Sequence, residues 1–283
     1  MSAEQMDWSR KSEKQHEETD RMDRSRRKVL VTGGSKGLGF AIARKLSEDG
    51  SQLVICGREQ SRLDSAIDEL KDNSRSLVAH GIVADLSQRS DVDMLFNRTL
   101  ELLGGLDCLV VNSGHAPYGT IDSLNDSDWD HSYDMLLMSA VRLSRAAARV
   151  MQASDGGDII FITSTGVHEA TDHRLASNVM RAGIAVVAKH LADFVSGTGV
   201  RVNVVAPGYF NTGRVRTRIE DLMNNEGLDF PSATRRIATA NPLGRIGMAN
   251  ELAELIAFMV GGRATYLNET TITIDGGSSR IVT

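Results

Sequence analysis

Short apolar runs alternate with helix-like stretches along almost the whole chain, and this alternation limits the folds that the chain can adopt. The first run, 29–31, is closed by glycines, and Leu38, Ile42 and Leu46 then recur every four residues, as on one face of a helix. The same change of pattern repeats towards the C-terminus. It predicts strands at about 29–31, 52–56, 77–84, 107–112, 159–163, 202–205 and 271–274, and helices at about 38–50, 63–70, 88–103, 128–153, 175–197 and 250–260.

Strands that are apolar throughout and separated by helices are typical of a parallel sheet that helices cover on both faces. Right-handed crossovers then give a doubly wound sheet, which binds its ligand at the carboxyl edge of the strands, near the point where the strand order reverses. We therefore expect an α/β fold: a Rossmann-type doubly wound parallel sheet of about seven strands in a single domain, which a length of 283 residues allows.

Two segments depart from this alternation. Residues 1–27 mix both signs of charge without apolar periodicity, so we expect a charged, flexible N-terminal tail, with packing on a partner subunit as the alternative. The tail lacks the apolar core of a secretory signal, and its acids disfavour a mitochondrial transit peptide. Within the domain at 28–283, the stretch at about 209–245 is rich in turn residues, so we expect it to be irregular and lid-like.

Charge and composition exclude several classes of protein. The net charge of −5 disfavours the basic surface of a nucleic-acid-binding protein. No apolar stretch reaches the roughly 18 residues that a membrane-spanning helix needs. Cys56 and Cys108 lie in apolar runs, which disfavours a disulfide framework or a cysteine zinc site, and the histidines show no metal-ligand spacing. We expect a cytoplasmic protein with no metal, no nucleic-acid partner and no membrane partner.

The turn at 32–39 carries the first functional signal. Its sequence, TGGSKGLG, lies between the first predicted strand and the first predicted helix. Glycines at such a position let the backbone approach a pyrophosphate, and the start of the helix supplies free N–H groups and the positive end of its dipole. The strand–turn–helix context favours a phosphate-binding turn over a turn that only serves packing.

With this turn, the sequence resembles the short-chain dehydrogenase/reductase family over about residues 28–280. The matches occur in the family's order: 32–39 resembles its TGxxxGxG turn, Asp85-Leu86 its adenine-contacting acid, Asn112-Ser113-Gly114 its NAG element, Ser164 its catalytic serine, Pro207-Gly208 with Thr212 its PG turn, and 274–277 its C-terminal signature. The resemblance implies a dinucleotide site made by Gly33, Ser35, Lys36, Gly37, Leu38, Gly39, Arg58, Asp85, Leu86, Asn112, Gly114, Arg181, Pro207, Gly208 and Thr212.

The end of the second predicted strand bears on which dinucleotide would bind. Family members that use NAD usually carry an acid there for the ribose 2′-hydroxyl, and the matching position here is Gly57, followed by Arg58. Arg58 offers a planar fork suited to phosphate, and Lys36 resembles the basic residue with which relatives hold the additional phosphate of NADP. The resemblance therefore implies NADP(H) in preference to NAD(H).

The catalytic motif of the family is only partly present. Its members use a serine, a tyrosine, a lysine four residues after the tyrosine, and an asparagine. Ser164 matches the serine, whereas Ser177, Arg181 and Leu136 occupy the positions of the tyrosine, the lysine and the asparagine. The stretch from Ser177 to Arg181 resembles a divergent branch of the family with Ser-x-x-x-Arg in place of Tyr-x-x-x-Lys. The implied catalytic residues are Ser164, Ser177 and Arg181, although a serine hydroxyl is a poorer acid than a phenol.

Three other side chains are candidates for the substrate pocket and for the missing proton donor. Tyr209 follows Pro207-Gly208, at the nicotinamide end of the site in this fold. His168 and His173 lie on the segment that lines the pocket in relatives, and histidine titrates near neutral pH. The alternative for each is a packing or surface role.

Three functions remain open. The first is an oxidoreductase that transfers a hydride between NADP(H) and a small-molecule carbonyl or alcohol with a non-standard proton donor. The second is a catalytically silent dinucleotide-binding protein that serves as a sensor or oligomer partner, and the third is elimination, isomerisation or epimerisation with bound cofactor. The stretches at 135–151 and 175–197 resemble the helices through which family members associate, so we expect a homotetramer or homodimer; a monomer in light scattering would contradict this.

Overall fold

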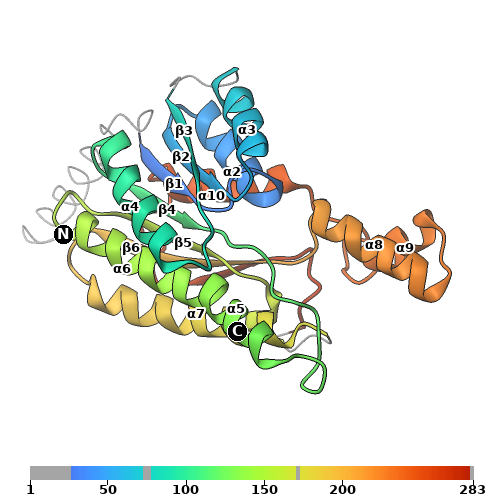
Figure 1. The fold of residues 1–283 in the computed structure, drawn as a ribbon. Coiled ribbons are helices and arrows are strands. Elements are labelled where there is room, and N and C mark those ends of the chain that lie inside the picture. Colours follow the sequence, from blue (N-terminus) through green and yellow to red (C-terminus); the bar gives the residue numbers. More distant parts are fainter. Residues whose placement is uncertain (1–26, 73–77, 170–172, 281–283) are drawn as a thin grey trace, which may run out of the picture.

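One parallel sheet forms the centre of the molecule (Figure 1). The structure, a computed structural model, describes residues 27–72, 78–169 and 173–280, so the predicted tail at 1–27 lies almost wholly outside the described residues. Seven strands are hydrogen-bonded in the order β3-β2-β1-β4-β5-β6-β7, which confirms the predicted doubly wound fold. They are β1 (Lys28–Val31), β2 (Gln52–Gly57), β3 (Ala79–Val83), β4 (Cys108–Val111), β5 (Gly157–Ile162), β6 (Val200–Pro207) and β7 (Thr271–Ile274).

Helices cover both faces of the sheet. One apolar cluster joins the sheet to α2, α3 and α10, with Ile42, Leu63 and Leu252 as members, and a second cluster on the other face joins it to α4, α6 and α7. Strands enclosed in this way have no polar face, which explains their continuous apolar sequence. The helices are α2 (Gly37–Glu48), α3 (Gln60–Asp72), α4 (Arg89–Leu103), α5 (Asp126–Ser132), α6 (Ser139–Gln152), α7 (Leu175–Phe194), α8 (Gly213–Glu226), α9 (Phe230–Ala238) and α10 (Ala249–Val260).

The strand order reverses between β1 and β4. β1 pairs with β2 on one side and with β4 on the other, so the crossovers leave these two neighbouring strands in opposite directions. A crevice therefore opens beyond their carboxyl ends. Asn112, just after β4, ties the two strand ends together: its side-chain amide donates to the carbonyl oxygens of Thr32 and Gly33, both at 3.2 Å.

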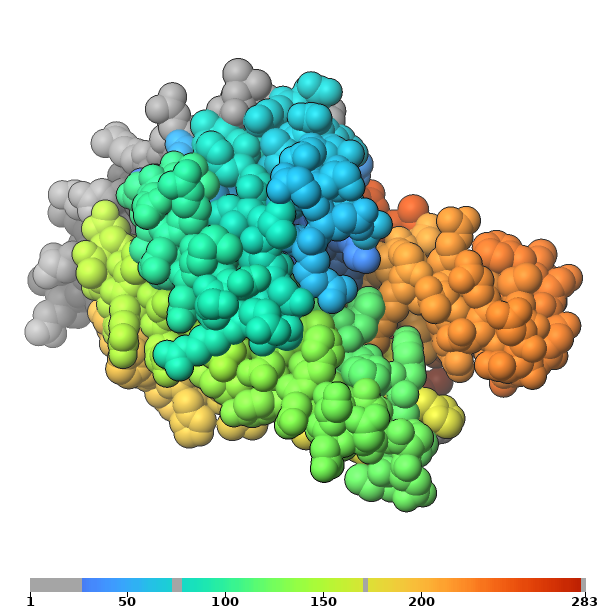
Figure 2. Space-filling model, viewed as in Figure 1, coloured from blue at the N-terminus to red at the C-terminus, as the bar shows by residue number. Residues whose placement is uncertain are grey.

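The segment at 209–245 differs from the sequence prediction. It contains α8 and α9, which project from the body of the protein (Figures 1 and 2). The two helices share a small apolar cluster, so the expectation of irregular structure was wrong. The turn residues mark helix boundaries: Gly227 ends α8 in the left-handed region at φ +66°, and Asp229 caps α9 by accepting from the backbone N–H of Ser232. Pro231 lies in the first turn of α9, where a missing N–H costs nothing.

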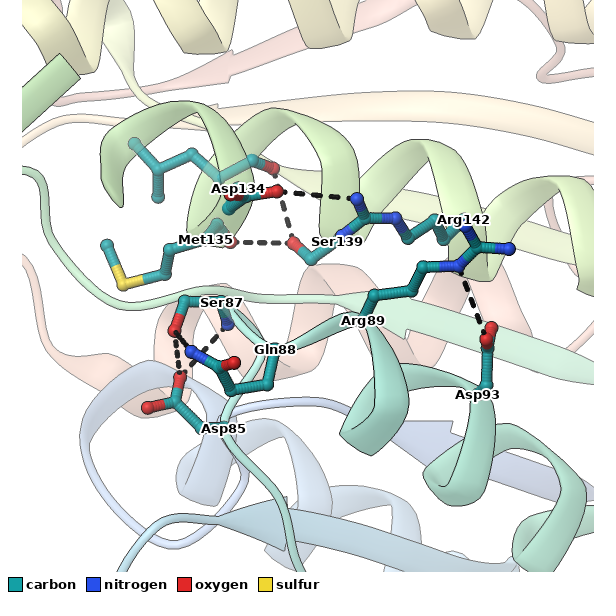
Figure 3. A network of polar contacts seen from close by, with 10 residues as sticks. Asp85, Ser87, Gln88, Arg89, Asp93, Asp134, Met135, Ser139 and Arg142 are labelled. Atoms are coloured by element: carbon teal, nitrogen blue, oxygen red, sulfur yellow. Dashed lines mark hydrogen bonds and ion pairs between the residues drawn. The ribbon is translucent and has the colours of Figure 1, made fainter. Parts of the chain in front are cut away.

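The helix expected at 128–153 is divided by a wider turn. Between α5 and α6, residues 133–138 form the π-helical segment η2, and the hydroxyl of Ser139 donates to the carbonyl oxygen of Met135 at 2.6 Å (Figure 3). Leu136, in this segment, is completely buried. Such interruptions of a helix are frequent near functional sites.

Asp158 joins two arginines at the opposite, amino-terminal edge of the sheet. This buried carboxylate on β5 lies 2.5 Å from Nη1 of Arg27 and 2.7 Å from Nη2 of Arg201. Burial opposes the charge of Arg27, but Asp158 outweighs it and raises the pKa of Arg27.

We expect Asp158→Asn to lower the free energy of unfolding by about 2 to 3 kcal/mol. The substitution removes the carboxylate charge that both arginines share. The loss of stability is smaller than for a fully buried ion pair, because both arginine side chains keep some contact with water. Urea unfolding measures it, with Asp155→Asn as the control because Asp155 is exposed three residues earlier. Equal stability of the two variants would show that Asp158 contributes no net stabilisation.

No helix of the described part of the chain combines the length and apolar character needed to cross a membrane. Nor do its histidine, cysteine and acidic side chains gather anywhere in a group of three or more that could hold a metal ion.

Candidate active site

A cavity of about 800 Å³ opens at the carboxyl edge of the sheet. Its walls come from the turn after β1, from the loops that follow β2 to β6, and from the first turns of α8. The predicted site residues that line it are Gly33, Ser35, Lys36, Gly37, Leu38, Arg58, Asp85, Leu86, Asn112, Gly114, Ser164, Arg181, Pro207, Gly208, Tyr209 and Thr212. The sequence therefore predicted side chains that share one cavity, although they are distributed over most of the chain.

The turn after β1 is closely packed against the start of α2. Gly33 has φ +56°, in the left-handed region that favours glycine. Gly39 does not line the cavity; a Cβ atom at Gly39 would lie 2.2 Å from the carbonyl oxygen of Gly33 and 2.7 Å from Nδ2 of Asn112. Only a glycine at position 39 lets the helix approach the turn this closely.

The first turn of α2 is open towards the cavity. Lys36 occupies the N-cap position without a side-chain hydrogen bond to the helix, and the first turn has no acidic residue. The backbone N–H groups at this end are therefore oriented for an anion, and the helix dipole adds to the attraction.

Charged side chains surround the end of the cavity near β2 and β3. Arg58, Arg62 and Glu59 follow β2, and Arg62 pairs with Glu59 at 2.9 Å. Asp85, after β3, accepts hydrogen bonds from the backbone N–H and the hydroxyl of Ser87, at 2.9 and 2.8 Å (Figure 3). Partial burial opposes ionisation of Asp85, but the bonds from Ser87 outweigh it and lower the pKa of Asp85.

Arg181 is buried and connects several elements. Its Nη1 donates to the carbonyl oxygens of Ile162 and Thr163, at 3.0 and 3.1 Å, and its Nη2 donates to that of Gly114 at 3.3 Å. Its Nε donates to the hydroxyl of Ser177 at 3.2 Å. A guanidinium has five N–H groups, so one N–H of Nη2 has no acceptor among the described residues and can bind a ligand in the cavity.

Burial lowers the pKa of Arg181 to about 9, and the nearby cations Arg214 and Arg174 contribute to the shift. Arg181 still carries its positive charge at neutral pH. No carboxylate of the described residues forms an ion pair with it, so its charge is satisfied by carbonyl dipoles and remains available to an anion.

The other predicted catalytic residues are divided between the cavity and the interior. Ser164 lines the cavity, and its hydroxyl oxygen accepts from the backbone N–H of Gly166 at 3.3 Å, which leaves its own O–H to donate. Ser177 does not line the cavity; it is buried and bonded to Arg181. Leu136 packs in an apolar cluster with Met180, so the asparagine position has no polar replacement.

Tyr209 presents a phenol to the cavity. Nη2 of Arg174 donates to its hydroxyl at 3.2 Å, and the Arg174 guanidinium lies 5.2 Å from the centre of its ring. Because the hydroxyl accepts this bond, its proton remains free to be donated to a ligand. The side chain of Arg174 fixes the phenol from one side.

Histidines occupy different places from those expected. His168 and His173 do not line the cavity: the ring of His168 lies 3.3 Å from the hydroxyl of Thr273, and His173 is exposed with φ +58°. His115 and His131, which the sequence analysis did not select, do line it. His115 directly follows the Asn112-Ser113-Gly114 element, and this adjacency was the available signal.

His115 is uncharged at neutral pH. Partial desolvation of this otherwise exposed side chain at the cavity wall, followed by the charges of Arg214, Arg181 and Lys36, lowers the pKa of His115. An imidazole in this state can form hydrogen bonds, but it carries no second proton to donate near neutral pH.

Comparison with known proteins identifies the family. A family model described as enoyl-(acyl carrier protein) reductase matches residues 33–279. Dehydrogenase/reductase SDR family member 4 of Bos taurus is 29% identical over 251 residues, which cover 88% of this chain and 86% of the relative. The oxidoreductase YvaG of Bacillus subtilis, itself uncharacterized, is 30% identical over 261 residues, covering 90% and 96%. The chain belongs to the short-chain dehydrogenase/reductase family of oxidoreductases.

Solved structures agree with this assignment. L-sorbose reductase from Gluconobacter frateurii, in complex with NADPH and L-sorbose, superposes with a TM-score of 0.86 at 29% identity and covers 90% of this chain and 97% of its own. YwfH, an NADPH-dependent reductase of bacilysin biosynthesis, superposes with a TM-score of 0.86 at 25% identity, covering 91% and 100%.

Proposed function

We propose that the protein is an NADP(H)-dependent oxidoreductase that interconverts a carbonyl and an alcohol with a non-standard proton donor. The observation that carries the proposal is that one continuous cavity connects the glycine turn after β1 to Ser164, Arg181 and Tyr209. Similarity to L-sorbose reductase in complex with NADPH and to the NADPH-dependent reductase YwfH supports the cofactor.

The residues fit a dinucleotide. The glycine turn exposes its backbone to the cavity, and the close approach of α2 to this turn leaves no room for a Cβ atom at Gly39. The N-terminus of α2 has no side-chain cap, so its N–H groups are available to phosphate. The cavity volume of about 800 Å³ is in the range of small-molecule sites. A bound nicotinamide dinucleotide would supply or accept the hydride. Lys36 and Arg58 would hold its additional phosphate, Asp85 and Leu86 its adenine, and the free N–H of Arg181 its ribose.

We expect the protein to bind NADPH at least about 10-fold more tightly than NADH, and Arg58→Gln to remove most of this preference. The β2 end bears Gly57 in place of an acid, and one charge-assisted hydrogen bond to phosphate contributes roughly 1.5 to 3 kcal/mol. Titration calorimetry with both cofactors measures the two dissociation constants. Arg44→Gln is the matched control, because Arg44 lies on α2 and does not line the cavity. Equal affinities for NADPH and NADH would refute the preference.

For the chemistry, we propose that Ser164 donates a hydrogen bond to the carbonyl oxygen and that Tyr209 donates the proton. His115 is uncharged, and serine and threonine hydroxyls are weak acids. His131, the other histidine of the cavity, is exposed and lies on the side of Asp85, where it contributes to the lowered pKa of that carboxyl. Tyr209, just after β6, thus takes the role that the family's tyrosine has at the position of Ser177 on α7.

A catalytically silent dinucleotide-binding protein is the second candidate. It is favoured by Ser177, which is buried against Arg181 and does not line the cavity. Tight NADPH binding without NADPH oxidation, over a panel of ketones, aldehydes and polyols, would establish this function instead.

For the assembly, we propose the homodimer or homotetramer expected from the sequence, in the cytoplasm. The exposed apolar residues Val179 and Val186 on α7 support it, because exposed apolar stripes on a helix pack against partners. Light scattering measures the mass. We also propose that α8 and α9 form a lid over the cavity, because residues of the first turns of α8 line it.

A further inference from the structure

Cations accumulate at one end of the cavity. Arg174, Arg181, Arg214 and Arg218 all line the side reached by β6, α7 and α8, although the chain has a net charge of −5. The two carboxylates among the described cavity residues, Glu59 and Asp85, belong to the opposite end near β2 and β3. A site with one sign of charge and low-dielectric walls attracts the other sign.

We infer that Arg174 binds an oxyanion of the substrate, so that the substrate is an anionic carbonyl compound such as a short oxo acid. This inference rests on the proposed function, which puts the reacting carbonyl beside Tyr209. Arg174 uses one of its five N–H groups on the Tyr209 hydroxyl, and the structure shows no carboxylate of the described residues paired with it. The remaining fork is suited to a carboxylate or phosphate.

The position of Arg174 is fixed on several sides. Its guanidinium lies 5.9 Å from the ring centre of Tyr118 and 5.2 Å from that of Tyr209, so two aromatic rings hold it in place. The backbone is held as well: Arg174 forms a bridge with Gly119, and the N–H of Gly119 donates to the carbonyl oxygen of His173 at 2.9 Å. A binding group that is already ordered loses less entropy when the ligand arrives.

His173 adds a second sign of a built site. Its φ of +58° is uncommon for a residue other than glycine. Strain of this kind concentrates at functional sites, where the surrounding structure maintains it. Here the strained residue comes immediately before Arg174, at the start of α7.

The mutual repulsion of the cations supports an anionic ligand. Arg174, Arg181 and Arg214 line the same cavity, and burial, followed by the charges of Arg214 and Arg174, lowers the pKa of Arg181. An anion between them would relieve this repulsion.

The geometry also limits the substrate. Tyr209 and Arg174 contact each other at 3.2 Å, so a carbonyl oxygen on the phenol and an oxyanion on the guanidinium must be close neighbours in one molecule. This favours a 2-oxo or 3-oxo acid over a 4-oxo acid. A carbonyl compound with a phosphate group at a similar distance would bind in the same way, because phosphate is also an oxyanion.

The test compares acids with their methyl esters on the NADPH-saturated protein. The probes are 2-oxo-, 3-oxo- and 4-oxopentanoate and their methyl esters, with dihydroxyacetone phosphate and dihydroxyacetone as the phosphate pair. We expect kcat/KM for the 2-oxo or 3-oxo acid, or for the phosphate, to exceed that of its neutral partner at least about 10-fold. If every ester or neutral partner reacts as well as its anion, the inference is wrong.

Substitutions of Arg174 test whether this residue causes the preference for an anionic substrate. Arg174→Gln should raise KM for the preferred anion at least about 10-fold more than KM for the neutral partner, because a change in the position of Tyr209 affects both substrates and the loss of the oxyanion contact affects only the anion. Arg174→Lys should restore part of the difference. Arg216→Gln is the matched control, because Arg216 is exposed on α8 and does not line the cavity. An unchanged KM in Arg174→Gln would assign the anion to another cation and overturn the role of Arg174.

Failure of this inference is separable from failure of the proposed function. The NADPH dissociation constant is measured for each variant. Binding of the same acids and esters is followed by calorimetry on the NADP+-bound protein, in which no hydride is available for turnover. Absence of NADPH binding would reject the proposed function. NADPH binding with equal affinity for acids and esters would reject the anionic substrate alone.

Discussion

Replacing Tyr209 by phenylalanine is expected to lower kcat about 100- to 10,000-fold, the usual contribution of a positioned proton donor. The phenylalanine ring keeps the packing and the contact with the Arg174 guanidinium, whose centre lies 5.2 Å away, but it loses the O–H. The dissociation constant of NADPH should stay within about 2-fold, because the loss concerns proton transfer and not cofactor binding. Stopped-flow or steady-state NADPH oxidation with the preferred carbonyl substrate measures the effect.

Tyr118→Phe is the matched control for this substitution. Tyr118 also faces the Arg174 guanidinium, with its ring centre at 5.9 Å, but it does not line the cavity. If Tyr209→Phe and Tyr118→Phe both turn over at the wild-type rate, another group donates the proton, and the assignment to Tyr209 fails.

The second large effect concerns Gly39. We expect Gly39→Ala to raise the dissociation constant of NADPH at least about 100-fold, equivalent to roughly 2.7 kcal/mol. The new Cβ atom would lie 2.2 Å from the carbonyl oxygen of Gly33, which is backbone, so the turn and the start of α2 must separate. Calorimetry measures the binding, and circular dichroism with thermal unfolding shows whether the variant is folded.

Gly183→Ala serves as the control for an added methyl group at a helical glycine. Its Cβ atom would meet only the end of the Leu137 side chain, at 3.3 Å, and alanine favours a helix. Wild-type NADPH affinity in folded Gly39→Ala would mean that the turn does not bind the cofactor phosphates.

Local sequence patterns were enough to predict the sheet and many of the residues that line the cavity. The apolar runs predict strands and the glycine turn at 32–39 predicts a strand–turn–helix unit. A parallel sheet then brings the carboxyl ends of all its strands to one edge. The sequence does not predict α8 and α9, because Gly227 and Pro231 are typical of irregular segments as well as of helix ends, and here Gly227 ends α8 and Pro231 lies in the first turn of α9.

The site was harder to predict where function depends on contacts between distant segments. Ser177 precedes Arg181 by one helical turn, so their hydrogen bond follows from spacing, but its exclusion from the cavity follows from the packing of α7. Arg174 gave no sequence signal. Its position depends on the strained backbone of His173 and on Tyr209, which is 35 residues away.

The burial of both cysteines has a practical consequence. Cys56 is 1% exposed and Cys108 is fully buried, and burial raises the pKa of Cys56 to about 12 and that of Cys108 further. The thiolate is the reactive form of cysteine, so a maleimide dye should react only slowly with the two native cysteines. The sequence contains no other cysteine. A single cysteine introduced at the exposed Arg216 would therefore carry a fluorophore selectively, and its emission would report on movements of α8 during ligand binding.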